Sequence, residues 1–242
     1  MSWELVYIIS GLAMLPVLIF AIIASIRVST VIHHYHQLDV PVGITAKDLV
    51  QRIAAENHLN IQVEQTTDSL GDHYDPQSKV VRLTGKVLHS TSVSALAIAA
   101  HECGHALQDA QNYLPLRFRH FVIRLSNFTS RLLTPLIIIS FIATLLTAGL
   151  ALETMKWVLL GFCIFYGLSA LASFITLPTE FDASRRGKKL LEDMHLMETK
   201  EERQGVNKVL RAAANTYVIS FAMSLIYFLR YLSYFMLIRK RD

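Results

Sequence analysis

The stretch AIAAHECGHALQ, residues 97–108, places His101 and His105 four positions apart, with Glu102 directly after the first of them. The alanines and leucines around these residues favour an α-helix. On a helix, positions four apart lie on the same face, so both imidazoles can reach a single ion. The stretch therefore predicts a helix that holds a metal ion.

Two histidines with an adjacent glutamate are the arrangement with which zinc hydrolases bind the metal and take a proton from its water. Such short patterns also arise by chance, and a lone helical histidine is more often a surface or core residue. Burial of His101, Glu102 and His105 among alanine and leucine is costly unless a metal pairs with them. Gly104 leaves room for a substrate or a neighbouring strand. Cys103 projects about 100° away from its neighbours around the helix, so we expect it to pack rather than react.

The composition is that of a membrane protein, because 52% hydrophobic against 17% charged residues is too apolar for an ordinary soluble domain. Residues 5–26 carry no charged side chain and predict an uncleaved first span. Residues 132–177 predict a hairpin of two spans with a short turn near Glu153. Residues 212–238 are interrupted by Arg230, so this segment either spans the bilayer as a fourth helix or lies in its interface.

Basic residues are concentrated in two regions. Ten of the 23 lysines and arginines fall in residues 27–131, and eight fall in residues 178–211. By the positive-inside rule both regions are predicted to be cytoplasmic. The basic end of the chain, residues 239–241, agrees with the rule only if the last segment is interfacial or re-entrant. We therefore expect one integral multi-pass membrane unit, residues 1–242.

Two capped helices are expected in the first basic region. Thr45 is the N-cap candidate of an amphipathic helix over residues 45–58. Ser90–Ser92 supply N-cap candidates for the motif helix, which should end near Gln111 because a proline follows.

A small antiparallel sheet is expected between these helices. Residues 60–65 alternate in the manner of a strand, and residues 72–84 predict two strands joined by a turn. A strand edge beside the metal could pair with an extended peptide through main-chain hydrogen bonds. The strand that we nominate as this edge consists of Lys79, Val80, Val81, Arg82 and Leu83. Sheet and motif helix together predict a zincin-like α+β unit built onto three or four transmembrane helices, in a mainly α protein.

Catalytic zinc takes three protein ligands and keeps one position for water, so a third ligand is required. The segment TLPTEFDASRR, residues 176–186, returns to the same side of the membrane after two spans. Pro178 is expected in the first turn of a new helix that contains Glu180. Glu180 and Asp182 are both candidate ligands, and a carboxylate in a first helical turn is also favoured simply by the helix dipole.

Four segments resemble the bacterial membrane zinc metallopeptidase family typified by YugP: HYDPQSKVVRL (73–83), AIAAHECGHALQ, TLPTEFDASRR and AANTYV (213–218). The likeness covers essentially the whole chain. More distantly, H-E-x-x-H followed after a membrane hairpin by E-F-x-A is similar to membrane zinc proteases of the HtpX and CAAX type. The resemblance implies one zinc ion bound by His101, His105 and Glu180, with Glu102 as the general base.

One position departs from the distant relatives, which carry an aspartate four residues after the ligand glutamate. Here that position is Ser184. An aspartate there would orient a ligand through a charged hydrogen bond, which a serine cannot supply. Asp182 and Ser184 are both candidates for orienting the histidines.

The resulting hypothesis is a zinc-dependent endopeptidase that hydrolyses polypeptides at the cytoplasmic face of the membrane, with Glu102 taking the proton of the attacking water. His73, Tyr74, His120 and Tyr217 are candidates for stabilising the oxyanion of the tetrahedral intermediate. A second hypothesis is a catalytically silent membrane scaffold or quality-control adaptor with a structural zinc site. A transporter is disfavoured because no span carries paired polar residues at mid-depth.

The expected partners are a polypeptide substrate and the lipid bilayer. Arginines alternate with aromatic residues over Leu116–Arg131, immediately before a predicted span. This pattern indicates contact with anionic lipid head groups rather than with nucleic acid. Association with a second copy of the chain, or with another membrane protein, stays open at this point.

Overall fold

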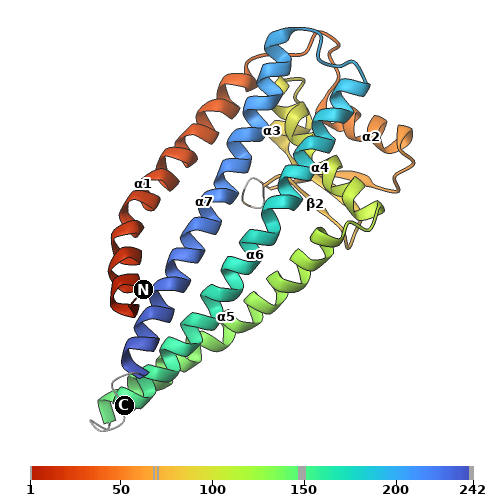
Figure 1. Cartoon of the computed structure of the whole chain (residues 1–242). Helices are drawn as coiled ribbons and strands as arrows, with labels where there is room; N and C mark the ends of the chain where they lie inside the picture. Colours follow the sequence, from red (N-terminus) through yellow and green to blue (C-terminus); the bar gives the residue numbers. More distant parts are fainter. Residues whose placement is uncertain (1, 68, 70, 147–150, 240–242) are drawn as a thin grey trace. The chain divides into compact units, whose positions relative to one another are not determined.

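The computed structural model describes residues 2–67, 69, 71–146 and 151–239, apart from the side chain of His120 and several side chains in residues 130–154. The described chain is mainly helical and contains one small sheet (Figure 1). Its elements are α1 (Trp3–His36), α2 (Ala46–Glu56), β1 (Gln62–Thr66), β2 (His73–Asp75), β3 (Val80–Thr84), α3 (Gly85–Leu88), α4 (Val93–Ala110), α5 (Leu114–Leu146), α6 (Ala151–Asp193) and α7 (Lys200–Arg239).

The chain forms two compact units, each assembled from segments that are far apart in the sequence. Unit 1 contains Met1–Ile23, Phe118–Thr176 and Tyr217–Asp242. Unit 2 contains Ala24–Arg117 and Leu177–Thr216. Unit 2 therefore combines most of the two basic regions that the charge distribution assigns to one side of the membrane.

Unit 1 contains part of each long apolar helix, and each of these helices continues into unit 2. Three described helices are long and apolar enough to cross a membrane, namely α1, the Met155–Asp193 part of α6, and α7. Large apolar side chains such as Leu12 and Phe20 are exposed along α1, as expected for a surface that faces lipid. Three predicted segments thus correspond to apolar helices: residues 5–26, the second span of the hairpin at 132–177, and residues 212–238. The second predicted span runs from α5 into residues 147–150, which lie outside the described residues.

Arg230 of α7 is held by protein groups within unit 1. Its guanidinium carbon lies 4.5 Å from the centre of the Tyr7 ring of α1, and its Nη2 donates a hydrogen bond of 3.2 Å to the Tyr7 hydroxyl. Gly11 allows this approach, because a Cβ there would lie 2.5 Å from the guanidinium. A charge in an apolar segment is costly in lipid. The cation–π contact places that charge against protein.

Unit 2 contains a three-stranded sheet in the order β1-β3-β2. β2 and β3 form the expected antiparallel hairpin, with Tyr74 opposite Val81. β1 runs parallel to β3, with Val63 opposite Val81, so the prediction of a purely antiparallel sheet is wrong. The physical reason is the path of the chain. After β1 the chain crosses to the far side of the sheet, and the tight turn after β2 brings β3 back between the two earlier strands.

The central position of β3 also corrects the nominated substrate edge. Both main-chain sides of β3 are paired, one with β1 and the other with β2. Val80, Val81 and Leu83 are buried, as is usual for a central strand covered on both faces. The strand formed by Lys79–Leu83 therefore cannot offer an edge to a peptide. Within the described part of the chain, the outer side of β2 has no strand partner.

Both capped helices form as predicted. The Thr45 hydroxyl oxygen accepts a hydrogen bond from the Asp48 N–H at the start of α2. Ser92 caps α4 by accepting from the Ala95 N–H, and α4 ends at Ala110. Each cap satisfies an N–H that the first helical turn leaves unpaired, which stabilises the helix by roughly 1 kcal/mol.

The core of unit 2 fixes α4 against the sheet and against α6. Its fully buried side chains come from α2, β3, α4 and α6, and they include Leu49, Ile53, Leu83, Leu96 and Leu191. Burial of one such side chain contributes roughly 1.5–3 kcal/mol. The polar residues on α4 are therefore presented from a well-packed helix.

Helix α6 is a single helix of 43 residues with Pro178 inside it, so the predicted start of a new helix at this proline is wrong. A proline inside a helix removes one main-chain hydrogen bond and often ends the helix. A continuous helix nevertheless keeps the remaining main-chain groups paired, which is strongly favoured in and near a bilayer. Glu180 consequently lies far inside a helix, and the helix-dipole explanation for this carboxylate no longer applies.

Candidate metal centre

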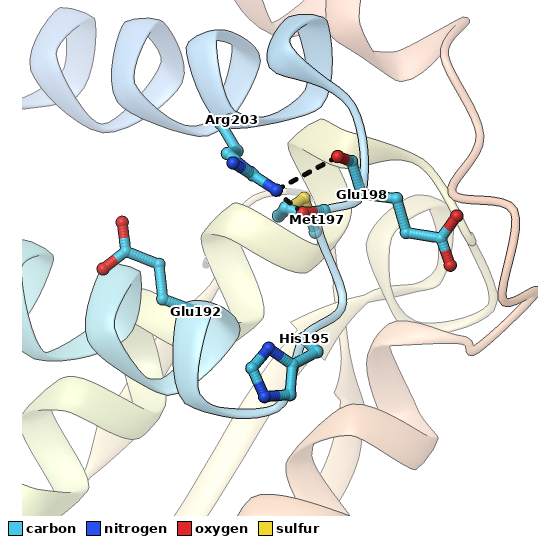
Figure 2. A pocket seen from close by; sticks show the side chains of 5 residues that line it. All are labelled: Glu192, His195, Met197, Glu198 and Arg203. Carbon is cyan, nitrogen blue, oxygen red and sulfur yellow. Dashed lines mark hydrogen bonds between the residues drawn. The ribbon is translucent and has the colours of Figure 1, made fainter.

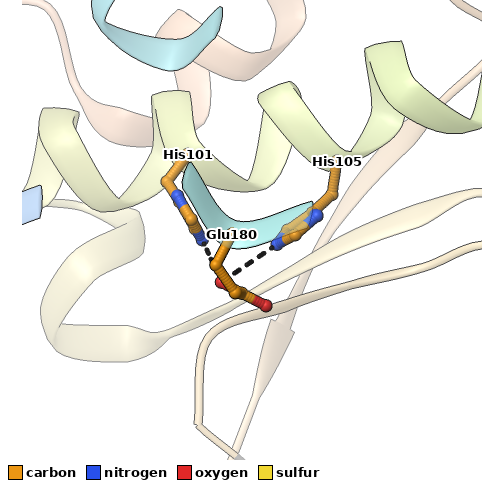
Figure 3. A group of neighbouring side chains, drawn as sticks. All are labelled: His101, His105 and Glu180. Atoms are coloured by element: carbon orange, nitrogen blue, oxygen red, sulfur yellow. Dashed lines mark hydrogen bonds and ion pairs between the residues drawn. The ribbon is translucent and has the colours of Figure 1, made fainter. Parts of the chain in front are cut away.

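His101 and His105 of α4 and Glu180 of α6 point toward one another (Figure 3). Glu180 Oε2 lies 3.2 Å from His101 Nε2 and 3.6 Å from His105 Nε2. One ligand atom from each of the three residues lies within 4.8 Å of the other two. Tetrahedral zinc with bonds of about 2.0–2.2 Å separates its ligand atoms by roughly 3.3 Å. The two distances from Glu180 to the histidines are close to this value, and the triad could hold a single zinc ion.

The triad is also chemically suited to zinc. Glu180 is 2% exposed and His105 is 8% exposed. Burial of a carboxylate is costly unless an opposite charge or a metal compensates it, and two imidazoles with one carboxylate are a known donor set of catalytic zinc. Among the described residues, the group that could hold a metal includes Glu180 and does not include Asp182. The geometry thus favours Glu180 of the two candidate ligands.

Two glycines bring α4 and α6 into backbone contact. A Cβ on Gly104 would overlap the carbonyl oxygen of Ala183, and a Cβ on Gly187 would lie 2.6 Å from the carbonyl oxygen of Ala100. Because the helices pack this closely, side chains of one helix meet those of the other directly. The neighbour that Gly104 admits is a helix, whereas the sequence suggested a strand or a substrate.

Each histidine is held through its Nδ1 atom. His101 Nδ1 lies 3.1 Å from the Ser184 hydroxyl oxygen, and His105 Nδ1 lies 3.0 Å from the amide oxygen of Gln108. An amide oxygen only accepts hydrogen bonds, so His105 donates through Nδ1 and keeps the Nε2 lone pair for a metal. Fixing the ring through the other nitrogen is the usual way in which a ligand histidine is oriented.

Gln108 is a residue of the centre that the sequence reasoning missed. It is fully buried, and its amide nitrogen donates hydrogen bonds of 2.8 Å to the Thr179 carbonyl oxygen and 3.0 Å to Asp182 Oδ2. The sequence signal was a polar residue three positions after His105 on an otherwise apolar helix. Its role could not be inferred from the sequence, because two of its hydrogen-bond partners belong to α6.

Asp182 and Ser184 both take part in orienting the histidines, but in different ways. Ser184 contacts His101 directly, whereas Asp182 reaches His105 only through Gln108. The Asp182 carboxylate also accepts hydrogen bonds from the neighbouring arginines at positions 185 and 186. The Asp182 carboxylate therefore does not contact an imidazole, because the Gln108 side chain lies between Asp182 and His105.

Glu102 is buried beside the triad. Its Oε2 accepts a hydrogen bond of 2.8 Å from the backbone N–H of Tyr74 in β2. Burial raises the pKa of Glu102 to about 7, and the charge of Glu180 acts in the same direction, while His101 and the Tyr74 N–H oppose this rise. A cation bound by the triad would lower this pKa again. The carboxylate is then available as a base near neutral pH.

The four oxyanion candidates lie in different surroundings. The Tyr74 hydroxyl donates a hydrogen bond of 2.7 Å to Asp109, and burial together with this partner raises the pKa of Tyr74 well above its usual range. His73 Nδ1 lies 3.0 Å from a main-chain carbonyl two residues before it. Tyr217 belongs to unit 1, where it lines a cavity of about 280 Å³. The side chain of His120 lies outside the described residues. None of these contacts assigns an oxyanion role.

Cys103 is fully buried in the core of unit 2. Burial raises the pKa of its thiol far above the usual range. A thiol that stays protonated is a poor nucleophile. The expectation that Cys103 packs in the core is confirmed, and its burial disfavours a role as a nucleophile.

A separate pocket of about 510 Å³ lies at the turn between α6 and α7 (Figure 2). It is lined by Glu192, His195, Met197, Glu198 and Arg203. The Arg203 guanidinium donates hydrogen bonds of 3.0 and 3.1 Å to the carbonyl oxygens of Met197 and Glu198. These bonds stabilise the turn, and the lining residues are distinct from the triad.

Comparison with known proteins points to the same kind of chemistry. Residues 10–236 match the family described as "Putative neutral zinc metallopeptidase". The chain belongs to this family. It is also 36% identical over 214 residues to "Putative membrane protease YugP" of Bacillus subtilis (strain 168), and the match covers 88% of this chain and 90% of that protein. No solved structure matches the chain.

Membership in a zinc metallopeptidase family confirms the resemblance seen in the sequence and the predicted zinc cofactor. Within the described residues of this zinc metallopeptidase, His101, His105 and Glu180 form the group that could hold the ion. The relative is described as a membrane protease, and the three apolar helices agree with a membrane location.

Proposed function

We propose that this zinc metallopeptidase is a membrane endopeptidase in which His101, His105 and Glu180 bind the catalytic zinc and Glu102 is the general base. The observation that carries the proposal is the convergence of these side chains. Ligand atoms of the first three lie within 4.8 Å of one another, and the Tyr74 N–H holds Glu102 beside them. Structural zinc sites usually take four protein ligands. A group of three favours an enzyme over a silent scaffold.

The chemistry of the centre follows from its donor set. Zinc, when bound, supplies a Lewis acid that polarises the scissile carbonyl and acidifies a water molecule. Glu102 takes one proton from the attacking water as the water oxygen bonds to the carbonyl carbon. Glu102 then gives that proton to the amide nitrogen as the C–N bond breaks, which restores the carboxylate. The Tyr74 N–H keeps one Glu102 oxygen in place during both transfers.

An extended substrate can align along β2. The N–H and C=O groups of one strand residue point to the same side of the strand. Because the Tyr74 N–H points to Glu102, the Tyr74 carbonyl also lies on the outer side of β2, where no described strand pairs. Main-chain pairing along this side would bring a peptide bond near Glu102 with little demand on substrate side chains. β2 then takes the role that the sequence pattern gave to Lys79–Leu83.

The proposed active site faces the cytoplasm of a bacterial cell. Ala24–Arg117 and Leu177–Thr216 pack in one compact unit, and together they carry 15 of the 23 lysines and arginines. The positive-inside rule assigns such segments to the cytoplasmic side. The substrate in this arrangement is a polypeptide that reaches the site from the cytoplasm. The arginines of Leu116–Arg131, which precede the hairpin, contact anionic lipid head groups.

A Glu102→Gln variant tests the proposed function. Purified in detergent, it should bind as much zinc as the wild type and keep its melting temperature, because the amide is nearly isosteric. Its rate of casein cleavage should fall by at least about 10²-fold, since general-base catalysis is lost. The matched control is Glu56→Gln, at an exposed position of α2, which should cleave normally.

Zinc removal completes this test. A chelator should abolish casein cleavage by the wild type, and added zinc should restore it. Full cleavage by Glu102→Gln would contradict the assignment of the base. A wild-type protein that binds one zinc ion but hydrolyses nothing would favour the scaffold instead.

A further inference from the structure

Asp109 lies on α4 one helical turn beyond His105 and two turns beyond His101, on the same face of the helix. Its Oδ2 accepts a hydrogen bond of 2.7 Å from the Tyr74 hydroxyl and one of 2.5 Å from Lys79 Nζ. Asp109 is not part of the group that could hold the metal. Asp109 thus binds the Tyr74 hydroxyl and the Lys79 ammonium group through the same carboxylate oxygen.

Tyr74 is tied to α4 at two points. Its side-chain hydroxyl is bonded to Asp109, and its backbone N–H is bonded to Glu102. Glu102 and Asp109 are seven residues apart, which is close to two helical turns, so both face the strand from the same side of α4. One residue of β2 thus spans this face of the helix, with its ring at one end and its backbone at the other.

We propose that Asp109 is a positioning residue for peptide hydrolysis, because it holds the Tyr74 side chain and thereby sets the Tyr74 N–H against Glu102. This inference rests on the proposed role of Glu102 as the base. β2 has only three residues and one strand partner among the described elements, so its sheet contacts alone leave its distance from α4 weakly fixed. The Tyr74–Asp109 bond supplies that constraint.

Other contacts keep β2 in the sheet when this constraint is removed. Asp75 accepts a hydrogen bond of 2.8 Å from Arg82 of β3, and Asp72 accepts one of 2.7 Å from the Thr84 N–H. Loss of the Tyr74 hydroxyl should therefore leave the fold and the main-chain substrate edge intact. The expected defect lies in the orientation of Glu102.

The test compares Tyr74→Phe, Asp109→Ala and the double variant in the zinc-loaded, full-length protein, with casein as the substrate. Each single variant should lower kcat by about 10- to 100-fold, the scale of a small misplacement of a catalytic group. KM should change by less than about threefold. Zinc content and melting temperature should stay near wild type in Tyr74→Phe. The double variant should be no slower than the slower single variant, because both changes break one chain of contacts.

Two further variants separate positioning from general damage. Asp109→Asn keeps an oxygen acceptor for the Tyr74 hydroxyl and should recover most of the kcat that Asp109→Ala loses. Tyr113→Phe removes a hydroxyl from a tyrosine whose ring packs near Arg186, and it should have wild-type kcat. If Asp109→Ala does not fold, Tyr74→Phe carries the test, because it deletes a single oxygen atom.

A wild-type kcat in Tyr74→Phe or Asp109→Ala would overturn the inference, as would strictly multiplicative losses in the double variant. These outcomes differ from failure of the proposed function. That failure would appear as full activity in Glu102→Gln, whereas a dead Glu102→Gln beside a fully active Tyr74→Phe would exclude only the positioning role.

Discussion

His101 and His105 face the same Glu180 oxygen, yet their rings are oriented by very different surroundings. His101 is held across the helix contact by the hydroxyl of Ser184, at 3.1 Å. His105 is held from its own helix by Gln108, at 3.0 Å, and Gln108 is in turn fixed by two hydrogen bonds to groups of α6. The His101 half of the centre thus depends on the single hydroxyl of Ser184. The His105 half depends on the buried hydrogen bonds of Gln108.

The difference shows how the proposed centre is built without an aspartate next to either histidine. A carboxylate is present as Asp182, but it acts on Gln108 and on two arginines and not on an imidazole. Neutral side-chain groups therefore contact both rings. A neutral acceptor raises the basicity of a ligand histidine less than a carboxylate does, so the two halves should respond differently when their supports are removed.

The largest effect is expected from Glu180→Gln, which breaks both halves at once. Glu180 supplies the only carboxylate of the triad, and an amide is a poor zinc ligand. Zinc content should fall far below one ion per chain. The activity loss should exceed the about 10²- to 10⁴-fold that removal of a general base costs. Metal analysis of the purified variant checks this, and an Asp182→Asn variant that lost zinc equally would place the third ligand in doubt.

Gly104→Ala should also damage both halves, because it acts on the contact between the helices. The added Cβ would overlap the carbonyl oxygen of Ala183 and push α6 away from α4. Overpacking of this kind costs about 1–3 kcal/mol of stability. Thermal unfolding should show the loss, and zinc affinity should fall with it. Cys103→Ala, next along the same helix, is a control without added bulk, and its zinc affinity should stay near wild type.

Gln108→Leu should break only the His105 half. It removes the acceptor for His105 Nδ1 and takes away a partner of both Asp182 and the Thr179 carbonyl. Loss of a group that orients a ligand histidine typically weakens metal binding by about 10- to 100-fold. Stability should drop by about 1–3 kcal/mol, since buried acceptors lose a donor. Competition with a zinc chelator measures the first effect. An unchanged zinc affinity would show that the network is structural only.

Ser184→Ala should give the smallest effect, because it removes one neutral hydrogen bond from the His101 half. Zinc affinity should fall by no more than about tenfold, in line with a net contribution of roughly 0.5–1.5 kcal/mol. Ser184→Asp places a carboxylate at the same position and should bind zinc at least as tightly as the wild type. A loss in Ser184→Ala larger than in Gln108→Leu would reverse the comparison between the two histidines.

Much of this centre could be predicted because it depends on local rules. The spacing of His101 and His105 follows from helical periodicity, and the cap at Ser92 follows from side-chain chemistry. Glu180 was predicted from its position after two expected spans, and the structure brings it to the two histidines. Each of these inferences needs only the neighbouring sequence or the order of the segments.

The rest depends on contacts between distant segments. The parallel pairing of β1 with β3 is not encoded in either strand, because a strand accepts partners in both directions. Pro178 suggested a helix start, but tertiary packing and the demand for paired main-chain groups kept α6 continuous. The role of Gln108 could not be predicted because it depends on which groups of α6 lie opposite this side chain.

X-ray diffraction at the zinc absorption edge, from crystals of the zinc-loaded protein, tests the central assignment most directly. We predict one anomalous peak at about 2.0–2.2 Å from His101 Nε2, His105 Nε2 and a carboxylate oxygen of Glu180. A peak bound by Asp182 or by Cys103 in place of Glu180, or a fully loaded protein with no peak among the triad, would contradict it.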